Sequence, residues 1–451
     1  KNDPALFALA MAAGLGDVET RRAALAALPR VARIGTHLLH FASFVEQFRG
    51  WGRALRRAVA DWYNSQPIGE LAYQVVKYQQ RDGWSHADLL RLAHPVRPGK
   101  QDLYGWMVDG WPGVGDEPHD DPELRLVWAF ERAKRAESAT EMATLIRDYR
   151  LPREAVPTQW LTDARVWEAL LQDMPVTAMI RNLATMTRVG LLAPLSDAAK
   201  AIVAELGNAE RLRRARVHPI QVLAALKTYA SGRNVRGSGE WQPVGAIVDA
   251  LDAAFYVTFG NVEPAGRRLL LALDVSGSMA AGMVGGVPGL TPRAASAAMA
   301  LITANVEAWY AFVGFTAEKT TRYPEAAISP LAISPRQRLD DVERSVSNLP
   351  FGGTDCALPM IWAKEQGVKV DAFIVYTDSE SWAGEIHPVQ ALVEYRQRTG
   401  IPAKLVVVGM TSNGFSIADT NDAGMLDVVG FDTATPNMMS DFIREPIEKV
   451  A

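Results

Sequence analysis

The hydrophobic periodicity of the chain changes near Pro264, and this change divides the sequence into two kinds of structure. Before it, apolar residues recur at the 3.6-residue spacing of helices over most of residues 1–260, and the sequence lacks convincing alternating strand patterns. After it, buried-strand patterns such as residues 267–276 alternate with helical ones. We therefore expect an all-α helical-repeat solenoid over residues 1–262 and a doubly wound α/β domain over residues 263–451.

Local patterns within the helical half predict where its helices begin and end. The stretch from Pro29 to Phe48 has the spacing of a helix, and Ser85 with Asp88 resembles a capping box that opens another helix. Residues 95–122 are rich in proline, glycine and acidic side chains, which predicts a surface connection. The remainder of this half is expected to form short helices joined by brief breaks.

Length, apolar runs and cysteine content limit the class of protein. The 451 residues suit two or three domains, and the sequence holds no run of 18 apolar residues. Lys1-Asn2-Asp3-Pro4 lacks the basic and apolar segments that open a signal peptide. Cys356 is the only cysteine, so an intrachain disulfide is impossible. We expect a cytoplasmic protein that does not span a membrane.

Oxygen-bearing side chains gather at the ends of the strands predicted after Pro264. Asp274, Ser276 and Ser278 alternate as the chain leaves the first strand, which brings their side chains to one side. Thr354 precedes a predicted helix and Asp378 ends a predicted strand, so both belong to the edge where open α/β sheets bind ligands. Five oxygen donors with few charges predict a divalent metal site that suits Mg²⁺.

A second candidate site lies in the basic region of residues 21–100, which holds 13 basic and 5 acidic residues. On one predicted helix, Arg53, Arg56 and Arg57 share a face, and Arg49 lies one turn earlier. The apolar residues of the same helix fall on another face, which should meet the core. An arginine stripe of this kind predicts binding to the phosphate groups of a nucleic acid.

Further basic side chains could join this surface if neighbouring helices of a solenoid stand side by side. These candidates are Lys77, Arg81, His86, Arg91 and His94. Alternatively, each basic residue pairs with a carboxylate such as Asp61, Glu70 or Asp88, or simply faces water. A second basic cluster, RLRRAR at residues 211–216, has no local pattern that decides which way it faces. Helices that carry arginines suit RNA recognised by its shape and single-stranded ends rather than by readable groove edges, and we do not expect DNA as a partner.

Both halves resemble one known family. The positions Asp274, Ser276, Ser278, Thr354 and Asp378 are similar to the metal-ion-dependent adhesion site of von Willebrand A domains. The helical half resembles the TROVE module of the Ro ribonucleoprotein family, in its bacterial form, and the likeness continues into the A domain. The segments that carry it are WGRALRRAVADWYN (51–64), GWSHADLLRLAHP (83–95), MPVTAMIRNLATMT (174–187), ARVHPIQVLAALKTY (215–229), GTDCALPMIWA (353–363) and MTSNGFSIAD (410–419).

The resemblance implies more than the residues do by themselves. It implies a ring of HEAT-like helical pairs closed by the A domain, with a metal ion held by the five A-domain positions. It implies that small noncoding Y RNAs bind the helical surface and that single-stranded ends of misfolded RNAs enter the ring. It also implies RNA quality control under stress with an exoribonuclease such as polynucleotide phosphorylase. Family members usually carry further helices before the position matching Lys1, so we expect this chain to lack them.

The sequence favours binding over catalysis. It contains no Gly-x-x-x-x-Gly-Lys phosphate loop, and its histidines show no metal-ligand spacing. The neutral donors Ser276, Ser278 and Thr354 differ from the carboxylate clusters of two-metal nucleases. We therefore expect an RNA-binding protein that is not an enzyme. The alternative is a protein-binding scaffold whose A-domain metal accepts a partner's carboxylate as a ligand.

Overall fold

The computed structural model describes residues 3–96, 98–111, 115–235, 237–317, 327–347, 349, 353–378, 384–411 and 417–447. The segment 410–419 therefore lies partly outside the described residues. The chain forms two compact units, residues 1–174 and residues 175–451. Within the described ranges, no helix is long and apolar enough to cross a membrane.

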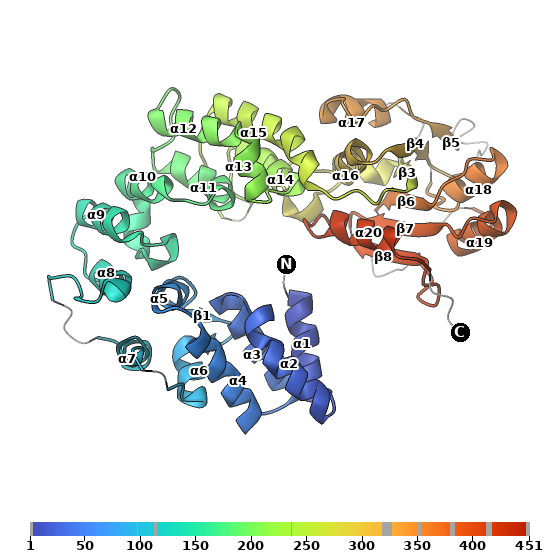
Figure 1. Ribbon diagram of the computed structural model, residues 1–451. Coiled ribbons are helices and arrows are strands. Elements are labelled where there is room, and N and C mark those ends of the chain that lie inside the picture. The colour runs from blue at the N-terminus through green and yellow to red at the C-terminus, as the bar shows by residue number, and fades with distance from the viewer. Residues whose placement is uncertain are drawn as a thin grey trace. The chain divides into compact units, whose positions relative to one another are not determined.

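The first unit is helical apart from one short hairpin (Figure 1). Its α-helices are α1 (Asp3–Leu15), α2 (Val18–Val31), α3 (Gly35–Phe48), α4 (Arg53–Ser65), α5 (Ile68–Lys77), α6 (His86–Ala93), α7 (Gln101–Asp109), α8 (Arg125–Ala133), α9 (Ala139–Tyr149) and α10 (Ala164–Gln172). The hairpin pairs β1 (Gln80–Arg81) with β2 (Trp84–Ser85), and short 3-10 helices are η1 (Pro122–Leu124), η2 (Arg153–Ala155) and η3 (Thr158–Thr162).

Two sequence predictions for this unit are wrong in part. The helix expected from Pro29 to Phe48 is broken, because Pro29 belongs to the last turns of α2 and α3 begins at Gly35. Gly35 lies close to the ring of His86, where a Cβ atom would come within 2.9 Å of Nε2. The surface connection expected over residues 95–122 contains α7, whose helix-spaced Leu103 and Trp106 are buried.

The predicted capping box is confirmed. The Oγ of Ser85 accepts a hydrogen bond from the backbone N–H of Asp88 at 3.2 Å, and Asp88 Oδ2 accepts one from the backbone N–H of Ser85 at 3.0 Å. These two bonds satisfy backbone donors in the first turn of α6, which would otherwise lack partners. The same residue, Ser85, ends the β1–β2 hairpin, so α6 starts directly from the hairpin.

The second unit continues with helices and ends in an α/β domain. The helices are α11 (Val176–Arg188), α12 (Asp197–Leu206), α13 (Ala209–Arg214), α14 (Pro219–Ala230), α15 (Gly245–Val257) and the 3-10 helix η4 (Thr258–Asn261). Residues of α15 contact the α/β domain. The hydroxyl of Tyr256 accepts a 2.8 Å hydrogen bond from the backbone N–H of Leu339, and Asp252 forms an ion pair with Arg338.

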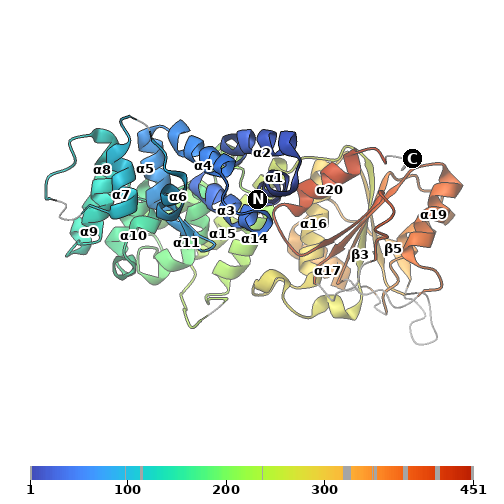
Figure 2. The same cartoon turned by 90° about the horizontal axis from the view of Figure 1, so that it is seen from below.

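The α/β domain is built on a six-stranded sheet of order β5-β4-β3-β6-β7-β8, in which only the edge strand β5 is antiparallel to its neighbour. Figure 2 shows helices on both faces of this sheet. The strands are β3 (Arg268–Asp274), β4 (Trp309–Phe315), β5 (Ile328–Pro330), β6 (Ala372–Thr377), β7 (Lys404–Gly409) and β8 (Met425–Val429). The helices are η5 (Gly277–Ala280), η6 (Val284–Gly286), α16 (Pro292–Val306), α17 (Leu339–Ser347), α18 (Leu358–Glu365), α19 (Pro388–Thr399) and α20 (Thr435–Arg444). The predicted combination of a helical region and a doubly wound α/β domain is confirmed, although the short strands β5 and β8 were not expected.

The central strand β3 is buried on both of its faces. Leu270 and Ala272 belong to the core that includes residues of α18 and α19. Leu269 lies on the other side of the strand, in a small gap that residues of α16 and α20 also line. An apolar run buried in this way carries the chain to the carboxyl edge of the sheet, where Asp274 is the last residue of the strand.

Candidate functional site

The first candidate site lies at the carboxyl ends of β3 and β6, and Asp274 is its centre. The Asp274 side chain is almost fully buried, with an exposed fraction of 1%. Its Oδ1 accepts a hydrogen bond from the backbone N–H of Ser276 at 2.8 Å, and its Oδ2 accepts one from Thr377 Oγ1 at 2.8 Å. The carboxylate is therefore held in one orientation by its own loop and by the neighbouring strand.

The predicted hydroxyl donors lie around this carboxylate. The Oγ atoms of Ser276 and Ser278 are 3.1 Å apart, and Thr354 Oγ1 donates a 3.5 Å hydrogen bond to Asp274 Oδ2. Ser276 and Thr354 are both buried. Four of the five predicted metal-site residues are thus linked by hydrogen bonds in one cluster.

Asp378 completes the cluster, because it directly follows β6, which pairs with β3. Burial raises the pKa of the Asp274 carboxyl to about 6, and the negative charge of Asp378 adds to this rise. The Oδ1 atom of Asp378 is buried and has no hydrogen-bond partner among the described residues. Two carboxyl groups are thus buried side by side, and one has an oxygen without a hydrogen-bond partner in the described part of the chain. A nearby positive charge would stabilise their ionised forms.

The donor set fits a hard divalent cation. All five donors are oxygens, from two carboxyl groups and three hydroxyl groups, and such ligands suit Mg²⁺. The part of the chain that the structure describes holds no group of three or more His, Cys, Asp or Glu side chains suited to a metal. The site therefore differs from a carboxylate-rich two-metal centre within the described residues.

Two contributors to this site were missed in the sequence. Thr377 precedes the predicted ligand Asp378, and its hydroxyl binds Asp274. Arg293, in the first turn of α16, donates from Nη2 to the backbone oxygen of Ser276 at 3.0 Å and to that of Val275 at 3.4 Å. Burial lowers the pKa of this guanidinium. No sequence signal identified Arg293, because its contact with the loop depends on how α16 packs against the sheet.

The second candidate site is the arginine surface of the first unit. Arg53, Arg56 and Arg57 are exposed on α4, and Arg49 is exposed just after α3. The core face predicted for α4, formed by Leu55, Val59 and Trp62, is buried. Within the described residues, no hydrogen bond or ion pair involves the side chains of these four arginines. Their charges are therefore available to an external anion.

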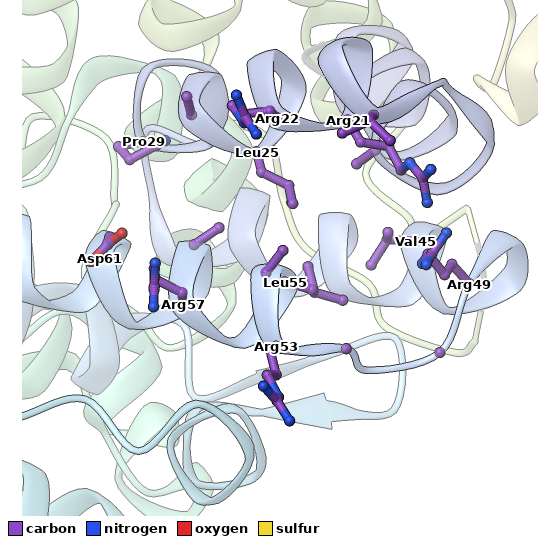
Figure 3. A pocket seen from close by; sticks show the side chains of 17 residues that line it. Arg21, Arg22, Leu25, Pro29, Val45, Arg49, Arg53, Leu55, Arg57 and Asp61 are labelled. Atoms are coloured by element: carbon purple, nitrogen blue, oxygen red, sulfur yellow. The ribbon is translucent and has the colours of Figure 1, made fainter.

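Three of these four arginines line one groove. Arg49, Arg53 and Arg57 line a groove of about 610 Å³ between α2 and α4, and Arg56 does not line it. Two further arginines, Arg21 and Arg22, line the same groove from α2 (Figure 3). The sequence analysis did not select this pair, because it depends on the packing of α2 beside α4.

A buried lysine holds the end of the arginine-bearing helix. Lys100 Nζ donates hydrogen bonds to the backbone oxygens of Tyr63 at 2.9 Å and Asn64 at 3.1 Å, and also to that of Gln66. These carbonyl groups lie at the C-terminus of α4, where a positive charge also interacts favourably with the helix dipole. No sequence pattern indicated that this lysine is buried.

His86 does not lie on the surface, which corrects its assignment as an RNA contact. Only 4% of it is exposed, and its Nδ1 is hydrogen bonded to the hydroxyl of Tyr63 at 2.7 Å. Burial lowers the pKa of His86 to about 4, so the ring is neutral at physiological pH. It is a core residue at the start of α6, and it offers no charge to a nucleic acid.

The other predicted basic residues have more local partners than the arginines of α4. The ammonium of Lys77 lies 5.2 Å and 5.4 Å from the ring centroids of Tyr73 and Tyr78. Arg81 lies 3.9 Å from Asp82, and Arg91 donates a hydrogen bond to the backbone oxygen of Val108 at 2.9 Å. His94 is exposed, with a φ of 48°, at the end of α6.

The second basic cluster, residues 211–216, is partly neutralised. Arg211 pairs with Glu205 at 2.8 Å, and Arg214 pairs with Glu210 at 2.5 Å. Exposed pairs of this kind stabilise a protein little, but they reduce the charge that a phosphate would meet. The arginines of α4 have no such pairs within the described residues.

The comparison with known families decides what kind of protein carries these two sites. The sequence model of the TROVE domain matches residues 1–234, which is more than half of the chain. The model described as the Ro60 vWA domain matches residues 268–443. The chain belongs to the Ro family. The resemblance found in the sequence is thereby confirmed for both halves.

Individual relatives support the same assignment to the Ro family. The chain is 46% identical to a Deinococcus radiodurans protein named RNA-binding protein RO60 over 449 residues, which cover 98% of this chain and 82% of that protein. It is 38% identical to the Caenorhabditis elegans RNA-binding protein RO60 over 480 residues, covering 94% and 73% of the two chains. The crystal structure of the Deinococcus radiodurans RO (RSR) protein matches with a TM-score of 0.89 and 46% identity, over 98% of this chain and 88% of that one.

Proposed function

We propose that this Ro-family protein binds RNA through the arginine surface of its first unit. The observation that carries the proposal is the set of exposed arginines on and beside α4, Arg49, Arg53, Arg56 and Arg57, which have no carboxylate partner among the described residues. Unpaired guanidinium groups bind phosphate with two parallel hydrogen bonds, and they also stack on unpaired bases. Both relatives are named as RNA-binding proteins, which supports the same function here.

The RNAs that suit such a surface are small and structured. Helices present side chains rather than a stacking platform, so recognition rests on phosphate positions, 2′-OH groups and single-stranded ends. We propose small noncoding Y RNAs and the ends of misfolded RNAs as ligands, and an exoribonuclease such as polynucleotide phosphorylase as a partner in RNA quality control in the cytoplasm under stress. The family membership of the chain supports these finer assignments. The protein would act by binding, and any cleavage would belong to the partner.

The second candidate function is metal-dependent docking of a protein to the α/β domain. The unsatisfied Oδ1 of Asp378 beside buried Asp274 favours it. Asp274, Ser276, Ser278, Thr354 and Asp378 would hold Mg²⁺, which would supply a positive charge able to accept a partner's carboxylate. The two functions use different units of the chain and are compatible.

One titration tests the RNA proposal and separates it from the metal site. A stem-loop RNA with a single-stranded 3′ tail is titrated with the protein in a gel-shift assay, at about 50 and 200 mM salt, with and without EDTA. The proposal predicts tight binding that weakens steeply with salt and is indifferent to EDTA. The matched control is a DNA stem-loop of the same sequence, which should bind more weakly. Absence of RNA binding, or its loss in EDTA, would contradict the proposal.

A further inference from the structure

The groove between α2 and α4 has an apolar floor between two parallel rows of side chains. Leu25 of α2 faces Leu55 of α4 across it (Figure 3), and Pro29, Ala54 and Ala58 also line the groove. Aliphatic side chains that line a concave surface provide a binding energy that needs no particular hydrogen-bond geometry. At one end the floor extends to Val18, which is 64% exposed. The apolar surface therefore exceeds what the packing of α2 against α4 requires.

The rims of this groove are strongly basic. Five arginines line it, whereas Asp61 is the one acidic residue among the described lining residues. Of the five, Arg49, Arg53 and Arg57 have no ion pair within the described residues. Arg21 donates from Nε to the backbone oxygen of Asp17 at 3.2 Å. The occupant that complements such rims carries negative charges on both sides of an apolar strip.

We propose that this groove binds an acidic amphipathic helix of a partner protein. The walls α2 and α4 contain 14 and 13 residues, and at about 1.5 Å per residue they are long enough to hold three to four turns of a helix. The apolar face of the bound helix packs on Leu25, Ala54 and Leu55. Its flanking glutamate and aspartate side chains bind the arginines of the rims with charge-assisted hydrogen bonds.

The lining favours a helix over unpaired RNA as the occupant of the groove. No aromatic ring is among the described lining residues, whereas proteins that bind single-stranded RNA stack its bases on aromatic side chains. The inference goes beyond the proposed RNA function, and the two share Arg49, Arg53 and Arg57. A helix in the groove therefore competes with RNA for these three arginines, whereas Arg56 contributes to RNA binding alone.

The test uses the whole chain and a defined probe. The probe is a fluorescein-labelled peptide of about 16 residues, with leucines at helical spacing on one face and glutamates on both flanks. The control peptide has the same glutamates and serine in place of each leucine. Binding is measured by fluorescence anisotropy for the natural protein and for Ala54→Gln, Arg57→Gln and Arg56→Gln. An oligouridylate is titrated against the same proteins, and circular dichroism checks that each variant is folded.

The variants distinguish a bound helix from bound RNA as the occupant of the groove. Ala54 is exposed in the floor, so glutamine there blocks the apolar strip without changing the charge. We expect Ala54→Gln and Arg57→Gln to weaken binding of the leucine peptide by about tenfold, and Ala54→Gln to leave oligouridylate binding within about twofold. Arg56→Gln should weaken oligouridylate and leave the peptide unaffected. Equal affinity for the leucine and serine peptides would overturn the inference. So would a loss of oligouridylate binding in Ala54→Gln, since the groove would then hold RNA.

Discussion

Thr377 Oγ1 on β6 donates a 2.8 Å hydrogen bond to Asp274 Oδ2 on the neighbouring strand β3, and the next residue of the chain, Asp378, has a buried oxygen without a partner among the described residues. The Asp274 carboxyl group is thus held by hydrogen bonds from the protein itself, whereas Asp378 Oδ1 has none within the described residues. We therefore expect the stability of the site around Asp274 and Asp378 to depend on both pH and divalent cations.

Replacing Asp274 should therefore have opposite effects with and without metal. In the folded protein the pKa of this carboxyl is raised from 3.8 to about 6, so its charged form costs stability above pH 6, and the cost fades as the pH falls from 6 to 4. In EDTA near neutral pH, Asp274→Asn should raise the free energy of unfolding by up to about 3 kcal/mol. Urea unfolding curves measure this difference.

The same curves recorded with Mg²⁺ provide the control for Asp274→Asn. The natural protein should be stabilised by the ion, whereas the variant should not, because it has lost one of the two carboxyl groups of the site. A variant that is less stable than the natural protein in EDTA would show that the buried carboxylate is not a source of strain.

Acid should weaken the first unit through His86. Its pKa in the folded protein is lowered from 6.5 to about 4 by burial, so its contribution to stability is complete above pH 6.5 and is lost as the pH falls toward 4. Between about pH 7 and pH 5 this amounts to roughly 2 kcal/mol. His86→Gln should give a flatter dependence of the unfolding free energy on pH. Parallel pH profiles for the two proteins would mean that His86 is not the titrating group.

Lys100→Met should destabilise the first unit more than the loss of an exposed lysine would. The ammonium binds the backbone oxygens of Tyr63, Asn64 and Gln66, and their loss leaves partly buried acceptors unsatisfied at the end of α4. We expect a loss of about 2–4 kcal/mol in the free energy of unfolding, measured by urea titration. Lys200→Met is the matched control, because within the described residues the Lys200 ammonium pairs with exposed Asp197 at 2.9 Å. Equal effects of the two substitutions would contradict the role of Lys100.

Predictions from the sequence succeeded where one strong periodic pattern decided the structure. The apolar run before Asp274 predicted both the central strand and the strand-end position of the carboxylate, and the structure has both. The capping box at Ser85 was also correct, because it depends on residues only three positions apart. Strand β8 was missed, because Met425–Val429 is short and follows a stretch rich in turn residues.

Features that depend on tertiary packing were not visible in the sequence. Arg22 and Arg57 are 35 positions apart, and only the packing of α2 beside α4 brings them to one groove. His86 has the sequence context of a surface histidine at the start of a helix, yet the approach of Gly35 and Tyr63 buries it. Lys100 follows a stretch of proline and glycine, which hid its role at the end of α4. Local spacing predicts which face a residue takes, whereas neighbours from distant segments decide whether that face is exposed.

The most direct test of the RNA-binding account is the salt dependence of RNA affinity in two matched double variants. Arg53→Gln with Arg56→Gln removes two unpaired arginines, whereas Arg211→Gln with Arg214→Gln removes two that already pair with Glu205 and Glu210. For the first variant we predict an affinity lower by about tenfold or more, and a slope of log K against log salt that is shallower by about 2. The second should bind as the natural protein does. Equal losses in the two variants, or an unchanged slope in the first, would contradict the assignment of RNA binding to the arginines of α4.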